Sequence, residues 1–168
     1  MKRSATQRFM PASLILAATL AAVPLAAHAA PPETVSDINF VLPAGIACGF
    51  ALQVDGTGGK ARVHEAVNGT AITAGRGFTL TFTNLATQEA LVIQPTGSAQ
   101  KVTDNGDGTF TVQATGGNVL ILFPSDPGGP STIQYMGRLV YTVDAQGVFT
   151  VRSTSGTSRD LCKELSPA

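Results

Sequence analysis

The feature that most constrains the fold is an alternation of apolar and polar residues with a period of two. Several short stretches place Phe, Leu, Val, Ile or Tyr at every second position, and threonine fills many of the positions between them. Successive side chains of a β-strand point to opposite faces, so the pattern is typical of strands with one buried face. An amphipathic helix would need apolar spacings of three and four. The alternating stretches are 46–54, 78–82, 109–113 and 139–143.

Two further runs, 90–93 and 119–123, are apolar throughout. Each is short and is bounded by turn residues, which predicts central strands covered on both faces. Clusters of Gly, Asn, Asp and Pro separate the strands at intervals of roughly ten residues, as in small all-β domains. The predicted turns are at 56–59, 68–69, 105–108, 116–118, 126–130 and Gly147.

These elements predict an all-β domain. We expect an antiparallel β-sandwich, with a small β-barrel as the alternative. A short C-terminal helix is also predicted, because Ser158 can cap it and Leu161 and Leu165 would share one of its faces.

The N-terminus has the order of features that marks a secretory signal peptide. Basic residues come first, an uncharged apolar stretch covers 14–27, and Ala27-His28-Ala29 follows with small side chains at the two positions that signal peptidase reads. A retained membrane anchor is the alternative, but the stretch is shorter than the roughly 20 residues that span a bilayer. We therefore expect cleavage after Ala29, a flexible leader over 30–37, and a single domain over 38–168. The expected destination is the extracellular space, or the periplasm and cell envelope.

Charge limits the classes of partner. Of 168 residues, removal of 1–29 leaves 139, with eight of the eleven basic residues and all eleven acidic ones, a net charge of −3. A weakly acidic chain without a run of Lys and Arg is a poor ligand for phosphate polymers or anionic membranes. We expect a monomer that binds no nucleic acid and, after cleavage, no membrane.

Both cysteines, Cys48 and Cys162, lie in the part that would be exported. Two cysteines in an exported protein most simply form one intramolecular disulfide. Two free thiols or an intermolecular bond are the alternatives. A zinc site is not expected, because the cysteines are far apart and no C-x-x-C is present.

Two loops resemble ligand-binding motifs. The run 56–60 ends in Gly59-Lys60 like a phosphate loop, but Ala61 follows where Ser or Thr is required, so a hairpin turn is the preferred interpretation. The run 104–108 holds two aspartates and an asparagine that could bind Ca²⁺, but its spacing is not that of an EF-hand. A tight hairpin is preferred there also. Asn68-Gly69-Thr70 matches the N-glycosylation pattern and is interpreted as a turn.

Few residues are available for catalysis. His64 is the only histidine after residue 29, and no G-x-S-x-G elbow accompanies it. A pair drawn from Glu65, Glu89 and Asp144 could act as in glycosidases, although scattered surface acids are the ordinary interpretation. We expect no catalytic residues, no metal and no cofactor.

Two other sets of residues bear on ligands. Arg76 and Arg138 each follow a glycine and are interpreted as strand starts that pair with acids across the sheet, with an anionic ligand as the alternative. Carbohydrate binding by stacking needs exposed flat aromatics, and the exported part has no Trp and two Tyr, Tyr135 and Tyr141. Its phenylalanines lie mostly on the apolar side of predicted strands.

Several short motifs occur in a particular order: Pro43-Ala44-Gly45, Cys48-Gly49-Phe50, Gly75-Arg76-Gly77, Thr83-Asn84-Leu85, Phe123-Pro124, Asp126-Pro127-Gly128-Gly129-Pro130, Gly137-Arg138 and Asp160-Leu161-Cys162. In this order the chain resembles a group of small secreted bacterial proteins of uncharacterised function. The resemblance covers most of the chain after residue 29. It implies secretion and a Cys48–Cys162 pair, and it implies no activity and no catalytic residues.

The leading functional hypothesis is a secreted, non-enzymatic module that binds a protein or extracellular ligand, or has a structural role. One alternative is a small secreted hydrolase that uses a carboxylate pair. The other is an inhibitor of a secreted enzyme, with the loop from Ser125 to Gly129 as the contact. Convergent acids in a pocket would favour the hydrolase, and a stiff protruding loop would favour the inhibitor.

Overall fold

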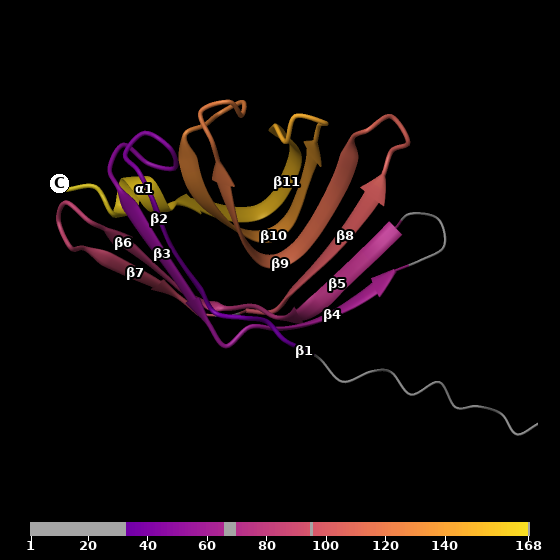
Figure 1. Cartoon of the computed structure of the whole chain (residues 1–168), viewed down its shortest axis with the longest axis horizontal. Coiled ribbons are helices and arrows are strands. Elements are labelled where there is room, and N and C mark those ends of the chain that lie inside the picture. The colour runs from indigo at the N-terminus through magenta and orange to yellow at the C-terminus, as the bar shows by residue number, and fades with distance from the viewer. Residues whose placement is uncertain (1–32, 66–69, 95, 168) are drawn as a thin grey trace, which may run out of the picture.

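The computed structural model describes residues 33–65, 70–94 and 96–167. These residues form eleven β-strands and one short α-helix (Figure 1). The predicted signal peptide, 1–29, and the predicted turn at 68–69 lie outside them. The elements are β1 (Glu33–Thr34), β2 (Ile38–Leu42), β3 (Leu52–Thr57), β4 (Lys60–Glu65), β5 (Thr70–Arg76), β6 (Thr79–Asn84), β7 (Ala90–Ile93), β8 (Ser98–Asp104), β9 (Phe110–Leu122), β10 (Ser131–Val143), β11 (Phe149–Asp160) and α1 (Leu161–Glu164).

The strands form two antiparallel sheets. One has the order β1-β4-β5-β8-β9-β10-β11, and the other has the order β2-β3-β6-β7. The smaller sheet lies beside α1, and the larger sheet curves away from the smaller one (Figure 1). This arrangement confirms the predicted antiparallel β-sandwich, and the described strands do not close into the alternative barrel. Strand β1, which pairs with β4, falls within the segment predicted as a leader.

The first hydrophobic core lies between the four-stranded sheet, α1 and one end of β9. Val119 and Ile121 of β9 pack against it from the larger sheet. Full burial of a large apolar side chain stabilises a fold by about 1.5–3 kcal/mol, so this core holds the two sheets together. Its buried members are Ala47, Cys48, Leu52, Val54, Phe82, Ile93, Leu161 and Leu165.

The second core lies on the opposite face of β9. Alternation along the strand directs Leu120 and Leu122 into it, while Val119 and Ile121 face the first core. The prediction that the run 119–123 is covered on both faces is therefore confirmed for 119–122, whereas Phe123 follows the end of β9 and is 36% exposed. The members of the second core are Ala114, Leu120, Leu122, Tyr135 and Leu139, with Ile133, Tyr141, Phe149 and Val151 packed against them.

The same prediction for the run 90–93 is wrong. Strand β7 is the last strand of the four-stranded sheet and pairs only with β6 among the described strands. Ile93 is buried, but Val92 on the other face is 55% exposed. A short apolar run has the same sequence pattern in a central strand and in an edge strand, so the neighbours decide its burial.

A row of glycines crosses the larger sheet where it bends. Gly116, Gly137 and Gly156 are register partners on β9, β10 and β11, and their φ angles are +85°, +137° and +94°. A Cβ atom at these positions would lie 2.3, 2.2 and 2.1 Å from a neighbouring backbone carbonyl oxygen. Only glycine adopts such angles without strain and allows this approach. We call this row the glycine crease.

Three predictions for segments that contain glycine are wrong. Residues 116–118 are not a turn, because β9 runs through them. Arg138 does not start a strand but lies within β10, and Arg76 ends β5. Glycine is favoured both in turns and at bends within strands, so its presence alone did not distinguish the two.

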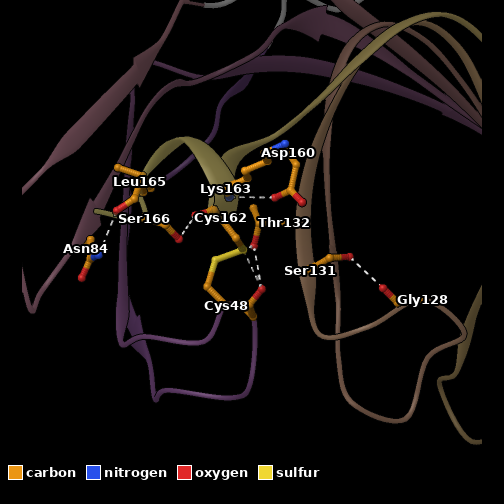
Figure 2. Close-up of a disulfide and its surroundings, with 11 residues drawn as sticks. Cys48, Asn84, Gly128, Ser131, Thr132, Asp160, Cys162, Lys163, Leu165 and Ser166 are labelled. Carbon is orange, nitrogen blue, oxygen red and sulfur yellow. Dashed lines mark hydrogen bonds between the residues drawn. A yellow bond between two sulfur atoms is a disulfide. The ribbon is translucent and has the colours of Figure 1, made fainter. Parts of the chain in front are cut away.

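The predicted disulfide between Cys48 and Cys162 is formed, with the two Cα atoms 5.4 Å apart (Figure 2). Cys48 lies in the loop before β3 rather than in a strand, because β3 begins only at Leu52. The bond attaches α1 to this loop, and the Thr132 hydroxyl donates to the Ala47 carbonyl oxygen beside it at 3.3 Å. The cross-link thus fixes the contact between the two sheets at the first core.

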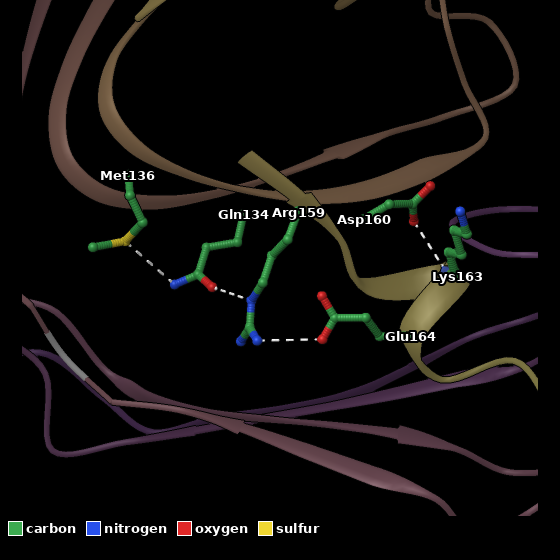
Figure 3. Close-up of polar contacts among 6 residues, drawn as sticks. All are labelled: Gln134, Met136, Arg159, Asp160, Lys163 and Glu164. Atoms are coloured by element: carbon green, nitrogen blue, oxygen red, sulfur yellow. Dashed lines mark hydrogen bonds and ion pairs between the residues drawn. The ribbon is translucent and has the colours of Figure 1, made fainter. Parts of the chain in front are cut away.

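The predicted C-terminal helix is present as α1, but its cap differs from the prediction. Ser158 belongs to β11, and the Asp160 carboxylate accepts the hydrogen bond from the Lys163 amide at 3.1 Å. Leu161 and Leu165 are both buried, as the spacing predicts. A polar contact supports the helix from outside: Arg159 donates to Gln134 at 2.7 Å and pairs with Glu164 at 3.2 Å (Figure 3).

Candidate functional site

The residues considered for catalysis do not form one site. His64 and Glu65 are neighbours on β4, so their side chains point to opposite faces of the sheet. Glu89 precedes β7 in the other sheet. Asp144 lies in the turn after β10, where its carboxylate accepts the amides of Gln146 and Val148 at 2.9 Å each. Within the described ranges, no three His, Cys, Asp or Glu side chains are placed to hold a metal.

The loop considered for Ca²⁺ is a hairpin turn whose carboxylates accept local hydrogen bonds. Asp104 accepts the Gly106 amide at 2.8 Å, and Asp107 accepts the Thr109 hydroxyl at 2.6 Å and the Thr109 amide at 2.9 Å. The hydroxyl bond, and then the amide bond, lower the pKa of Asp107 below its usual value. The geometry agrees with the preferred hairpin interpretation.

The loop considered as an inhibitor contact is held by a buried carboxylate. Asp126 is 4% exposed, and it accepts the Phe123 amide at 2.6 Å and the Phe149 amide at 2.8 Å. The second bond ties the β9–β10 loop to the start of β11. Two successive turns, Asp126 to Phe123 and Gly129 to Asp126, coil the backbone between these anchors. The loop is therefore stiff but not extended, whereas strand addition requires an extended segment.

Two small pockets lie on either side of Phe78. One, of about 200 Å³, is lined by Gln100, Asn118 and Gln134 together with the ring of Phe78. The other, of about 230 Å³, shares Phe78 and Gln100 and opens beside β4 and β5. Both are smaller than the roughly 300–1,000 Å³ of typical small-molecule sites. Their amide groups are partly paired with one another and with the backbone.

The largest candidate site is a whole face of the seven-stranded sheet. The crease divides β10 at Gly137. On the N-terminal side of Gly137, which we call before the crease, Thr132 and Gln134 face the first core and are buried. Beyond the crease, alternation puts Arg138 and Val140 on the same face of β10, where neither is buried. The register of β4, β5, β8, β9 and β11 extends this surface, which we call the outer face. Its members are Arg62, His64, Ile72, Ala74, Ala99, Lys101, Gln113, Thr115, Arg138, Val140, Ser153 and Ser155.

Arg152 joins the outer face through a β-bulge. The register between β10 and β11 shifts after Val140, which leaves Arg152 without a directly opposed residue. Its Nε atom donates to the hydroxyl of Thr142 at 3.0 Å, and Thr142 follows Val140 on the same side of β10. A bulge of this kind redirects a side chain without ending the strand. Beyond the crease the outer face thus carries four cations from four strands, and alternation also puts the exposed Lys60 and Arg76 on this side of β4 and β5.

Carboxylates do not share the outer face in the strands that build it. Glu65 on β4 and Asp104 on β8 fall on the opposite side by the same alternation. Asp160 ends β11 opposite Ile133, on the other side of the crease from Arg138, and it caps α1. The predicted pairing of Arg138 with an acid across the sheet is not seen, because its Nη2 atom donates instead to the Gln113 side chain at 3.3 Å.

In the part of the chain that the structure describes, no helix has the length and apolar character needed to span a bilayer. Comparison with known proteins finds no family model, no curated protein and no solved structure that matches this chain. Function is therefore argued from the chain's own residues.

Proposed function

We propose that this chain is an exported, non-enzymatic β-sandwich module that binds a partner in the extracellular or envelope space through its outer face. The observation that carries the proposal is that face itself. It spans six strands and holds no strand carboxylate, and it carries four cations beyond the crease in addition to Lys60 and Arg76 on β4 and β5. Charges of one sign on a rigid surface attract an oppositely charged partner and speed its association.

The fold supports a binding role because the face is rigid in its backbone. Each of its inner strands is hydrogen-bonded on both sides. The disulfide attaches α1, which follows β11, to the loop before β3, and the Asp126 contacts tie the β9–β10 loop to the start of β11. A surface that is already ordered loses little conformational entropy when a ligand binds.

The disulfide also agrees with export, since such bonds persist in oxidising compartments. An enzymatic role is less favoured by the geometry. The carboxylates of the turns at 107–109 and 144–148, Asp107 and Asp144, accept hydrogen bonds within their own turns and so have a structural role there. His64 and Glu65 point away from each other, so they do not form an acid–base pair.

The test uses protein purified after export from cells that express the full chain. Its N-terminus should be Ala30. It should co-sediment with the envelope or extracellular polymer fraction of the producing cells. It should not turn over protease, esterase or glycosidase substrates. An intact N-terminus in the membrane, or turnover that His64→Ala or a chelator abolishes, would contradict the proposal.

A further inference from the structure

We infer that the outer face binds a linear acidic polysaccharide that lies across the strands. This inference rests on the proposed function and names the chemical class of the partner. The relevant charges are Arg62 on β4, Lys101 on β8, Arg138 on β10 and Arg152 on β11. A polyanion that crosses the strands can contact all four in turn.

The spacing of these charges favours a polymer of moderate charge density. Neighbouring strands lie about 4.8 Å apart, so Arg62, Lys101 and Arg138, on every second strand, follow one another at about 10 Å. Duplex DNA carries a charge about every 1.7 Å, which a row of so few cations would leave largely unpaired. A polysaccharide with one carboxylate in each disaccharide has widely spaced charges of the kind that this row can pair.

The groups between the cations favour a sugar. Gln113, Thr115, Ser153 and Ser155 offer amide and hydroxyl groups that can hydrogen-bond to sugar hydroxyls. Phe, Tyr and Trp side chains, on which the bases of single-stranded nucleic acids stack, are absent from the strand positions that form this face, and His64 is its one aromatic ring. Lys60, Arg62 and Arg76 gather on this side of β4 and β5, but they are fewer than the roughly 4–8 basic residues that recruit anionic membranes.

Two of the cations are held in place before the ligand arrives. Arg138 is bonded to Gln113, and Arg152 is bonded to Thr142. A guanidinium has five N–H donors, so each arginine retains donors for a carboxylate. Positioning by a neighbouring side chain reduces the entropy lost when the polymer binds.

The experiment measures binding of the exported protein to immobilised hyaluronan, which has one carboxylate per disaccharide. Neutral dextran, single-stranded DNA and anionic phosphatidylglycerol vesicles are the comparison probes. We expect binding to hyaluronan that weakens as salt rises, and weaker or no binding to the other three. Tighter binding to DNA or to vesicles would overturn the inference.

Matched variants locate the site. Lys101→Gln and Arg62→Gln should each weaken hyaluronan binding about fivefold, which corresponds to an exposed ion pair of about 1 kcal/mol. Lys163→Gln removes the same charge from the exposed side of α1 and should change binding less than twofold. Unchanged far-UV spectra and urea midpoints will show that the variants are folded.

The outcomes separate this inference from the proposed function. The inference is wrong and the proposed function stands if the protein co-sediments with the envelope or extracellular polymer fraction but does not bind hyaluronan. The same holds if Lys101→Gln and Lys163→Gln weaken hyaluronan binding equally. If the protein binds neither the cell fraction nor any probe, both are wrong.

Discussion

The glycine crease makes a quantitative prediction at Gly116. Replacing Gly116 by alanine puts a Cβ atom 2.3 Å from the Gly97 carbonyl oxygen, whereas ordinary contacts begin at 3.4 Å. The backbone must also keep a φ near +85°, which costs an L-residue about 1–2 kcal/mol. Moving the two backbones apart adds about 1–3 kcal/mol, as in other overpacked sites. We expect Gly116→Ala to lower the free energy of unfolding by about 2–5 kcal/mol.

Two other glycines provide matched controls. Gly147 has a φ of +80°, but a Cβ there would meet nothing within 4 Å, so Gly147→Ala should lose only the backbone contribution of about 1–2 kcal/mol. Gly49 has neither a positive φ nor a close neighbour, and Gly49→Ala should stay within about 0.5 kcal/mol of the parent.

The assay is equilibrium urea unfolding followed by far-UV circular dichroism, with linear extrapolation to water. The decisive quantity is the difference between Gly116→Ala and Gly147→Ala, because the two share the cost of a positive φ. We expect about 1–3 kcal/mol between them. If Gly116→Ala is no more destabilising than Gly147→Ala, the close backbone approach does not limit this position and the crease argument fails.

Three further predictions concern other contacts. Removing the cross-link with Cys48→Ala and Cys162→Ala should lower the free energy of unfolding by up to about 5 kcal/mol, and an unchanged urea midpoint would contradict this. Asp126→Asn should cost about 1–3 kcal/mol in the same assay, because one of its two backbone donors would face an amide group instead of an acceptor. Burial raises the pKa of Tyr135 and Tyr141 above 10.0, so the stability from these neutral phenols is complete below pH 10.0 and falls as pH rises through the folded pKa. Tyrosinate absorbance should therefore rise at higher pH in the folded protein than in urea, and coincident titrations would count against the burial.

Much of the fold could be predicted from local pattern. Alternation identified parts of β3, β6, β9 and β10, because the direction of successive side chains is set within each strand. Strands β2, β5, β8 and β11 lie outside the alternating stretches and the apolar runs. The hairpin at 104–108 could be predicted because Asp and Asn accept hydrogen bonds from the backbone of their own turn. The disulfide followed from the small number of cysteines, since only one intramolecular pairing was available.

The crease was missed, although the sequence contains a signal for it. Gly116 and Gly137 are equally far from the turn at Asp126-Pro127, and Gly137 and Gly156 are equally far from the turn at 146–147. In a hairpin, positions equidistant from the turn become cross-strand neighbours. Glycines placed in this way align across the sheet, but that reading requires the turns and the register to be known first.

The candidate site was also beyond prediction from the sequence. Arg62, Lys101, Arg138 and Arg152 are far apart in the chain and form no basic run, and the net charge of the exported part is negative. Antiparallel pairing of β4, β5, β8, β9, β10 and β11 brings these cations onto one surface. Only the part of the larger sheet on the Thr132 side of the crease faces the four-stranded sheet. The surface on the Arg138 side is therefore left uncovered.

The sequence by itself determined where parts of β3, β6, β7, β9 and β10 lie, which of their residues are apolar, that the chain turns often, and that one disulfide is available. Those properties depend on neighbours in the chain, through side-chain alternation and turn chemistry. Only the tertiary structure decided which strands pair, where the sheet bends, and which exposed side chains share a face. Those properties depend on hydrogen-bond register between distant segments, and a shift of one residue in a strand would move the cation of that strand to the other side of the sheet.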